Sequence, residues 1–248
     1  MRVLILGGTQ EAYELAERLA EIERLEIISS LAGRTREPRQ PQGAMRSGGF
    51  GGPEGLARYL RDERIRFVVN ATHPFADQIS AHAVEAAAAS GTELLRLLRP
   101  AWRAAPEDRW IAARDAAEAA ELARREGGRI LLTVGSGELD AFAPVRNAHF
   151  VVRMVDVPER IPLHDYRIIA ARGPFELADE LRLLAEHHIN LVVAKNSGGG
   201  ATFAKLEAAR RLRLPVIMIE RPPIAQEPRS PVATSVDEVI AALRALLA

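Results

Sequence analysis

The stretch of sequence that decides the fold is Val3-Leu4-Ile5-Leu6-Gly7-Gly8-Thr9-Gln10-Glu11-Ala12. Its four apolar residues predict a short buried strand, its two glycines a tight turn, and the residues that follow the start of a helix. Glycines at such a turn let the backbone approach a pyrophosphate, whose charge is met by free N–H groups and by the positive end of the helix dipole. We therefore expect a dinucleotide to bind at Gly7, Gly8, Thr9 and Glu11.

The match to the dinucleotide pattern GxGxxG is incomplete, because Thr9 and Ala12 stand where the second and third glycines would be. Taken alone, the turn is also compatible with a purely structural role. Neighbouring residues must decide between the two interpretations.

The residues about 20 positions further on bear on which cofactor binds. An NAD site usually has an acidic residue there for the ribose hydroxyls, whereas this window reads Ser29-Ser30-Leu31-Ala32-Gly33-Arg34. Hydroxyls and a guanidinium can hold a 2′-phosphate through paired hydrogen bonds. The sequence therefore favours NADPH, with NADH possible, and assigns Ser29, Ser30, Gly33 and Arg34 to the cofactor. The alternative is a solvated Arg34 in a surface loop.

Short runs of Val, Ile and Leu alternate with segments of helical period along the whole chain, which is typical of parallel sheets covered by helices. We expect strands at residues 3–6, 26–30, 67–70, 94–98, 129–134, 150–155, 167–171, 191–194 and 216–220. We expect helices at residues 11–21, 53–63, 77–90, 116–125, 176–187, 204–212 and 236–247, and a proline-rich loop at 221–231.

This order predicts an α/β protein of two Rossmann-like lobes, each with a parallel sheet flanked by helices, and a ligand cleft between them. A polar segment with prolines near residue 100 marks the boundary. Residues 1–99 would form the N-terminal dinucleotide-binding lobe. Residues 100–248 would form a C-terminal α/β substrate-binding lobe.

Composition narrows the classes of partner. The chain has 248 residues, 48% of them hydrophobic, with 33 basic and 33 acidic side chains and no cysteine. Balanced charge argues against nucleic acid or an anionic membrane as partner, and the absence of cysteine excludes disulfides and thiolate metal sites. Neither a membrane-spanning run nor a signal peptide is recognisable. We expect a cytoplasmic monomer or small homo-oligomer without a metal.

Two further segments of the first lobe follow predicted strands or precede helices. Gly48-Gly49-Phe50-Gly51-Gly52 precedes a helix that begins at Pro53, so Gly49, Phe50 and Gly51 would contact the cofactor or form a flexible lid. The third strand ends at Asn70, and Ala71, Thr72 and His73 follow it. We expect Thr72 to contact the cofactor. His73 is a candidate to touch the nicotinamide or deliver a proton, and the alternative is a structural histidine.

Taken together, these segments resemble the precorrin-6A reductase family, including its cobalt-precorrin-6A counterparts. The similarity extends over nearly the whole chain, and its order and spacing are specific. The segments that carry it are Leu6-Gly7-Gly8-Thr9 with Glu11, Ser30-Leu31-Ala32-Gly33-Arg34, Gly48-Gly49-Phe50-Gly51-Gly52, Ala71-Thr72-His73-Pro74-Phe75-Ala76, Ala171-Arg172-Gly173-Pro174-Phe175 and Lys195-Asn196-Ser197-Gly198-Gly199. The resemblance implies that hydride from a reduced nicotinamide reduces a carbon–carbon double bond of the precorrin-6A macrocycle, giving precorrin-6B in cobalamin biosynthesis.

A precorrin is a large macrocycle with many carboxylates, so its site should offer cationic side chains and backbone N–H groups. The candidates in the second lobe follow predicted strands: Thr133, Gly135, Ser136, Arg172, Gly173, Lys195, Ser197, Gly198 and Gly199. The alternative is that these are ordinary strand-to-helix turns with solvated Arg172 and Lys195. Lys205 and Glu207 are expected on a helix surface. Asn196 and Ser136 depart from the family's usual pattern, in which Asp commonly replaces Asn196.

Three rival functions remain. The first is another NADPH-dependent reductase or dehydrogenase with a different substrate. A short-chain dehydrogenase is disfavoured because it would need a Tyr-x-x-x-Lys pair, and none of Tyr13, Tyr59 and Tyr166 has lysine four residues later. A regulatory sensor that binds NADPH without turnover fits the glycine turn as well as an enzyme does. A tetrapyrrole enzyme without cofactor is disfavoured by that turn. The sequence leaves open whether the substrate contains cobalt.

Overall fold

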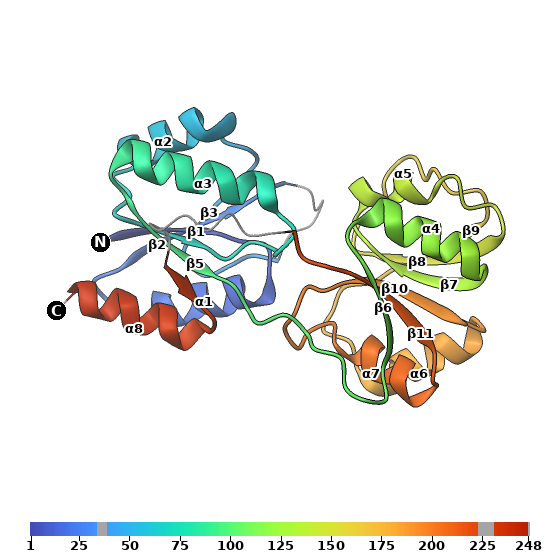
Figure 1. The fold of residues 1–248 in the computed structure, drawn as a ribbon. Helices are drawn as coiled ribbons and strands as arrows, with labels where there is room; N and C mark the ends of the chain where they lie inside the picture. The colour runs from blue at the N-terminus through green and yellow to red at the C-terminus, as the bar shows by residue number, and fades with distance from the viewer. Residues whose placement is uncertain (34–38, 223–230, 248) are drawn as a thin grey trace. The chain divides into compact units, whose positions relative to one another are not determined.

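The computed structural model describes residues 1–33, 39–222 and 231–247, which form two compact units. Unit 1 consists of Met1–Pro100 together with the C-terminal segment, described over residues 231–247. Unit 2 is Ala101–Pro222. Each unit contains one six-stranded sheet in which all neighbouring strands are parallel (Figure 1). The predicted α/β class with two parallel sheets flanked by helices is confirmed.

The sheet of unit 1 has the strand order β12-β5-β4-β1-β2-β3. Its strands are β1 (Arg2–Leu6), β2 (Glu26–Leu31), β3 (Ala44–Ser47), β4 (Phe67–Asn70), β5 (Glu93–Leu97) and β12 (Val232–Ala233). Read from β3, this is the 3-2-1-4-5-6 order of Rossmann sheets, with β12 as the sixth strand. The chain changes direction between the adjacent strands β1 and β4, which is the switch point where ligands of such sheets bind.

Helices cover both faces of this sheet because side chains alternate along each strand. Val3 and Ile5 pack on α1 (Gln10–Ala20) and α8 (Val236–Leu247). Leu4 and Leu6 pack on α2 (Gly52–Asp62) and α3 (Asp77–Ser90) on the opposite face (Figure 1).

The sheet of unit 2 has the order β6-β11-β10-β7-β8-β9. Its strands are β6 (Arg109–Ala113), β7 (Gly128–Thr133), β8 (Ala148–Met154), β9 (Tyr166–Ala170), β10 (Leu191–Lys195) and β11 (Pro215–Ile219). α6 (Leu177–Glu186) and α7 (Ala204–Arg211) lie on one face, and α4 (Ala116–Glu126) and the short α5 (Leu139–Phe142) on the other (Figure 1). A single 3₁₀ turn, η1 (Ser136–Glu138), precedes α5.

The structure corrects the expected assignment of the C-terminal segment to the second lobe. β12 pairs with β5, and α8 buries Val236, Val239 and Leu243 in the core of unit 1. The cause is an incomplete first lobe: without α8, one face of its sheet would expose apolar residues to water. The expected boundary near residue 100 coincides with the start of unit 2. The expected loop at 221–231 lies mostly outside the described residues.

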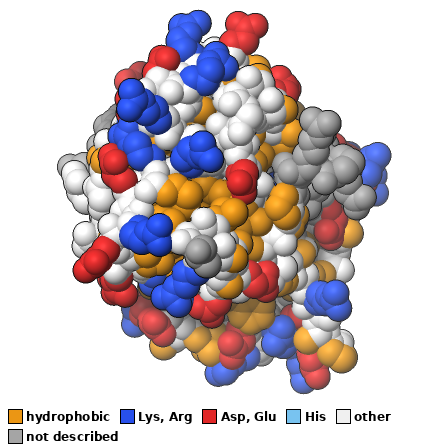
Figure 2. All heavy atoms as spheres, turned by 90° about the vertical axis from the view of Figure 1, so that its left-hand side faces the viewer, with side chains coloured by type: hydrophobic (Ala, Val, Ile, Leu, Met, Phe, Trp, Pro, Cys, Tyr) orange, Lys and Arg blue, Asp and Glu red, His pale blue; other side chains and the backbone are white. Residues whose placement is uncertain are grey.

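Figure 2 faces the end of unit 1 where Figure 1 shows both chain termini. Hydrophobic side chains gather at its centre, with acidic and basic side chains around them. Charges of both signs are therefore mixed on this face. No helix among the described residues has the length and apolar character needed to span a membrane.

Candidate functional site

The glycine turn of unit 1 connects β1 to α1 at the switch point. Gly8 has a φ of 109°, and a Cβ built there would meet no atom within 4 Å. A conformation that L-residues rarely adopt thus coincides with open space above the turn. The Oγ1 of Thr9 accepts from the Ala12 N–H at 3.2 Å and donates to the Ala71 carbonyl at 2.7 Å. The Thr9 hydroxyl therefore caps α1 and ties the end of β1 to the end of β4.

Glu11, expected to contact the cofactor, lies in the first turn of α1 and forms an ion pair with Arg99. Both side chains are largely buried. A carboxylate in the first turn already faces the positive end of the helix dipole. Arg99 reduces the charge that this carboxylate would present to a phosphate, and the sequence reasoning did not identify it. Arg99 lies two residues after the end of β5, and this place after a strand is the signal that was available.

The end of β2 lies beside the glycine turn, since the Gly7 N–H donates to the Ser30 carbonyl at 3.0 Å. The Ser29 side chain is 3% exposed, and its Oγ has no hydrogen-bond partner among the described residues. A buried hydroxyl without a partner costs free energy, and a ligand would satisfy it. Gly33 packs against Gly48 at the end of β3. Arg34 lies outside the described residues.

The glycine-rich segment 48–52 leads from β3 into α2, and it is held by Arg46, a residue that the sequence reasoning missed. Arg46 donates to Ser30 Oγ at 2.7 Å and to the carbonyls of Gly48 and Gly49 at 3.0 and 2.9 Å. Its guanidinium lies 3.7 Å from the centroid of the Phe50 ring. Arg46 thus brings together three residues that were expected to contact the cofactor: Ser30, Gly49 and Phe50. Gly51 is the residue before α2.

Thr72 and His73 follow β4 at the same edge of the sheet. The Thr72 hydroxyl donates to Asn70 Oδ1 at 2.7 Å, and the Asn70 amide donates to Ser80 Oγ at 3.1 Å. The Phe75 N–H donates to His73 Nδ1 at 3.3 Å. Nδ1 is the acceptor in this contact.

This arrangement fits a dinucleotide. Open space above a glycine with positive φ, the first turn of α1 and the unsatisfied Ser29 hydroxyl all lie at the carboxyl edge of one sheet. That edge is where Rossmann sheets bind the pyrophosphate and the adenosine ribose.

The switch point of unit 2 lies between β7 and β10, and the expected residues Thr133, Gly135 and Lys195 lie there. Lys195 Nζ donates to Glu138 Oε1 at 2.7 Å. A Cβ at Gly135 would stand 2.7 Å from Glu138 Oε2, so glycine gives this carboxylate room to reach the lysine. The Thr133 hydroxyl donates to the Val193 carbonyl at 2.9 Å. Ser136 begins η1.

The loop after β9 reaches the loop after β10. The Phe175 N–H donates to the Ala201 carbonyl at 3.1 Å, and a Cβ at Gly173 would lie 3.1 Å from the same oxygen. Arg172 and Gly173 are thus placed beside the segment that contains Ser197, Gly198 and Gly199. Unit 2 therefore brings its three expected segments to one edge of its sheet.

Trp102 is a further residue of this region that the sequence reasoning missed. Its backbone N–H donates to Asn196 Oδ1 at 2.8 Å, the Asn196 amide donates to its carbonyl at 3.2 Å, and its indole donates to the Gly199 carbonyl at 2.9 Å. Arg221 binds the carbonyls of Asn196 and Ser197 at 2.8 and 3.0 Å. Asn196 is thus a structural residue that fixes its loop.

Lys205 was expected on a helix surface, and this expectation is wrong. It is 4% exposed, its Nζ donates to the Thr202 carbonyl at 2.6 Å, and it lies 5.0 Å from the Trp102 ring. Lys195 and Lys205 are the only lysines of the sequence. The rarity of lysine in this arginine-rich chain was the signal that could have identified Lys205 as well as Lys195.

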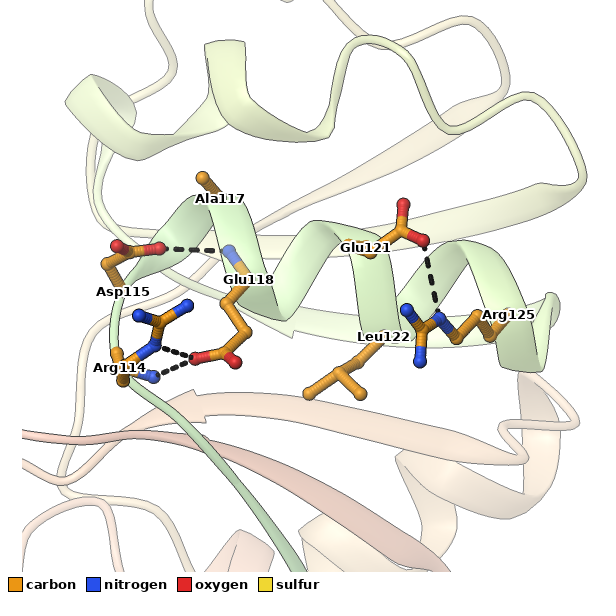
Figure 3. Close-up of a pocket in the computed structure, with 7 residues that line it drawn as sticks. All are labelled: Arg114, Asp115, Ala117, Glu118, Glu121, Leu122 and Arg125. Atoms are coloured by element: carbon orange, nitrogen blue, oxygen red, sulfur yellow. Dashed lines mark hydrogen bonds and ion pairs between the residues drawn. The ribbon is translucent and has the colours of Figure 1, made fainter.

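A pocket along α4 is separate from these residues (Figure 3). Arg114 pairs with Glu118 at 2.9 Å, and Glu121 pairs with Arg124 and Arg125 at 2.8 and 3.3 Å. The two ion pairs of Glu121 lower its pKa to about 2, chiefly through the hydrogen bond from Arg124. The charged groups that line this pocket pair with one another along one helix, which is typical of a solvated surface. Among the described residues, no group of three or more His, Cys, Asp or Glu is placed to hold a metal ion.

Comparisons with known proteins agree with this arrangement over the whole chain. A family profile described as precorrin-6x reductase CbiJ/CobK matches residues 2–244. The precorrin-6A reductase of Rhodococcus erythropolis is 48% identical over 98% of this chain and 96% of its own length, and that of a Sinorhizobium species is 48% identical over 89% and 85%. A solved structure of CobK precorrin-6A reductase has a TM-score of 0.93 at 41% identity and covers 98% of this chain and 96% of its own. The chain belongs to the CbiJ/CobK precorrin-6x reductase family.

Proposed function

We propose that the protein reduces a carbon–carbon double bond of precorrin-6A to give precorrin-6B, with NADPH as the hydride donor, in cobalamin biosynthesis. The observation that carries the proposal is the Gly7-Gly8-Thr9 turn at the switch point of a sheet with Rossmann order, in a chain whose relatives are named precorrin-6A reductases. Unit 1 would be the dinucleotide-binding lobe and unit 2 the substrate-binding lobe.

Each unit contributes binding groups to this reaction. The N–H groups of the first turn of α1 would bind the pyrophosphate, and the Ser29 hydroxyl would bind the adenosine ribose. Arg172 and Lys195 would bind carboxylates of the macrocycle. Lys195 is held in place by Glu138, to which its Nζ donates at 2.7 Å.

The nicotinamide supplies the hydride when it is bound, and the chain aligns the reactants and excludes water. The reduction also needs a proton. A neutral His73 that donated its Nε2 proton would become an imidazolate, which is unfavourable, and protonation of Nδ1 would break the bond from the Phe75 N–H. We therefore favour solvent or a ring substituent as the proton source and assign His73 a positioning role.

The test is anaerobic NADPH oxidation by the purified protein with precorrin-6A, followed by absorbance and by the mass of the product. We expect a gain of two hydrogens per NADPH consumed. His73→Gln should retain activity within about tenfold, because general acid catalysis contributes about 10²–10⁴-fold where it operates. A larger loss with unchanged NADPH affinity would restore His73 as the acid.

The same assay with cobalt-precorrin-6A and with NADH separates the variants of this reaction. The names of the two relatives favour the metal-free substrate. NADPH binding without turnover of either tetrapyrrole would contradict the reductase and support a sensor that binds NADPH.

A further inference from the structure

Arg46 is held rigidly at the carboxyl edge of the unit 1 sheet. It lies opposite Ser30 in the register of β2 and β3. Its guanidinium donates hydrogen bonds to Ser30 Oγ and to the carbonyls of Gly48 and Gly49. The rings of Phe50 and Tyr59 lie 3.7 and 5.3 Å from its guanidinium carbon. The guanidinium is therefore preorganised and loses little further freedom on binding a ligand.

The charge of Arg46 has no anionic partner in the part of the chain that the structure describes. All three of its acceptors are neutral oxygens, which occupy three of the five N–H groups of a guanidinium. Burial lowers the pKa of Arg46, and Tyr59 opposes this shift. A partly buried cation without a counter-ion is unfavourable, and an anionic ligand would offset this cost.

Unit 2 contains an arginine that also packs on an aromatic ring but is paired with a carboxylate. The guanidinium carbon of Arg153 lies 3.9 Å from the centre of the Phe175 ring, and Phe175 belongs to the loop that follows β9. The same guanidinium pairs with the buried carboxylate of Glu180. The protein itself thus supplies an anion to Arg153, whereas no such carboxylate meets Arg46 among the described residues.

The position of Arg46 indicates which anion it binds. In sheets of this order the adenosine ribose lies at the end of the second strand, where Ser30 accepts the Arg46 bond. We propose that Arg46 binds the 2′-phosphate of NADPH and thereby makes the site selective for NADPH over NADH. This inference rests on the proposed function, because it requires a nicotinamide dinucleotide at the Gly7-Gly8-Thr9 turn. It extends to Arg46 the role that the sequence suggested for Arg34.

The test is calorimetric titration of the full chain with NADPH, NADH, adenosine 2′,5′-bisphosphate and 5′-AMP. Arg46→Gln should lower the affinity for NADPH and for the bisphosphate by about tenfold to a hundredfold, as expected for the loss of a hydrogen bond between charged groups. The affinities for NADH and 5′-AMP should change less than about threefold, because these ligands lack the 2′-phosphate and make no such bond. Arg46→Lys keeps the charge without the paired geometry and should recover part of the bisphosphate affinity.

Two controls separate binding from loss of structure. Arg58→Gln removes an exposed charge from α2 of the same unit and should leave all four affinities unchanged. Thermal unfolding of each variant reports whether the loop anchored by Arg46 still folds. If Arg46→Gln weakens NADPH and NADH equally, or if Arg34→Ala removes the NADPH preference while Arg46→Gln does not, the proposal is overturned.

The same titrations distinguish this inference from the proposed function. A wild-type protein that binds neither dinucleotide overturns both. A protein that binds NADPH but does not reduce the macrocycle contradicts only the reductase, and the bisphosphate titration still decides the role of Arg46.

Discussion

At the scale of single residues, Gly8 is the position where backbone conformation and proposed function meet. Replacing Gly8 by Ala places a Cβ on a residue with a φ of 109°. We expect the free energy of unfolding to fall by about 1–3 kcal/mol, which is the usual cost of such a conformation. NADPH affinity should fall as well, because the side chain enters the open space above the turn.

Urea unfolding and NADPH titration check this prediction. Gly49→Ala is the matched control for stability: Gly49 also faces open space but has no positive φ. It should change the free energy of unfolding by less than about 0.5 kcal/mol. Equal losses in the two variants would show that the conformation of Gly8 is not the cause.

Asn196 tests how a single amide fixes a loop. Asn196→Ala leaves the N–H and the carbonyl of Trp102 without partners in a region where residue 196 is 5% exposed. We expect a loss of about 1–3 kcal/mol in the free energy of unfolding. Asn196→Asp keeps the acceptor for the Trp102 N–H, so its loss should be smaller.

Tryptophan fluorescence in a urea titration measures both variants, since Trp102 is one of only two tryptophans. An Asn196→Asp variant less stable than Asn196→Ala would mean that the carboxylate's repulsion of the Trp102 carbonyl outweighs the bond that it keeps.

At the scale of elements, α4 predicts a pH dependence. The pKa of Glu121 falls from its ordinary 4.5 in the unfolded chain to about 2 in the folded protein. A depressed carboxyl pKa stabilises the fold above about pH 4.5, and that contribution is lost as pH falls toward 2. Glu121→Gln should therefore be less stable than wild type at pH 7, with a smaller difference near pH 3.

Urea unfolding at both pH values measures this difference. Glu121 is exposed, so added salt should also reduce it. Glu159→Gln, at an exposed loop position without an ion pair among the described residues, should show no such trend. A difference for Glu121→Gln that does not change with pH would argue against these ion pairs in solution.

The elements also show what the sequence could predict. β4 at Phe67–Asn70 and α3 at Asp77–Ser90 have the predicted bounds, because continuous apolar runs and helical periods are strong signals. The missed strands β3, β6 and β12 all lie at sheet edges, where burial is incomplete and the apolar pattern is weak.

The same cause explains what was missed in the candidate sites. Because β3 was not recognised, Arg46 could not be placed beside Ser30. Trp102 and Lys205 depend on contacts between segments far apart in the chain, which local spacing does not report. In contrast, the glycine turn and the residues after β4 and β10 follow directly from strand ends, and the structure places them there.

At the scale of the whole molecule, the two sheets share one plan. In each, three successive strands run outward in chain order, and the next two lie on the other side of the first. The sixth strand differs: β12 comes from the chain's end in unit 1, and β6 precedes the other five in unit 2. Each unit thus has its own core, and we expect the units to unfold separately.

Leu243→Ala tests this independence together with the location of the cofactor. Leu243 is fully buried between α8 and the unit 1 sheet, so its truncation should cost about 2–5 kcal/mol in that unit alone. Calorimetry should show two unfolding transitions, one of them with a lowered midpoint temperature. NADPH should raise the midpoint temperature of that same transition by mass action. Leu184→Ala, in the core of unit 2, should lower the other. If NADPH instead raised the transition that Leu184→Ala lowers, the dinucleotide would bind unit 2, and the assignment of the Gly7-Gly8-Thr9 turn to cofactor binding would be wrong.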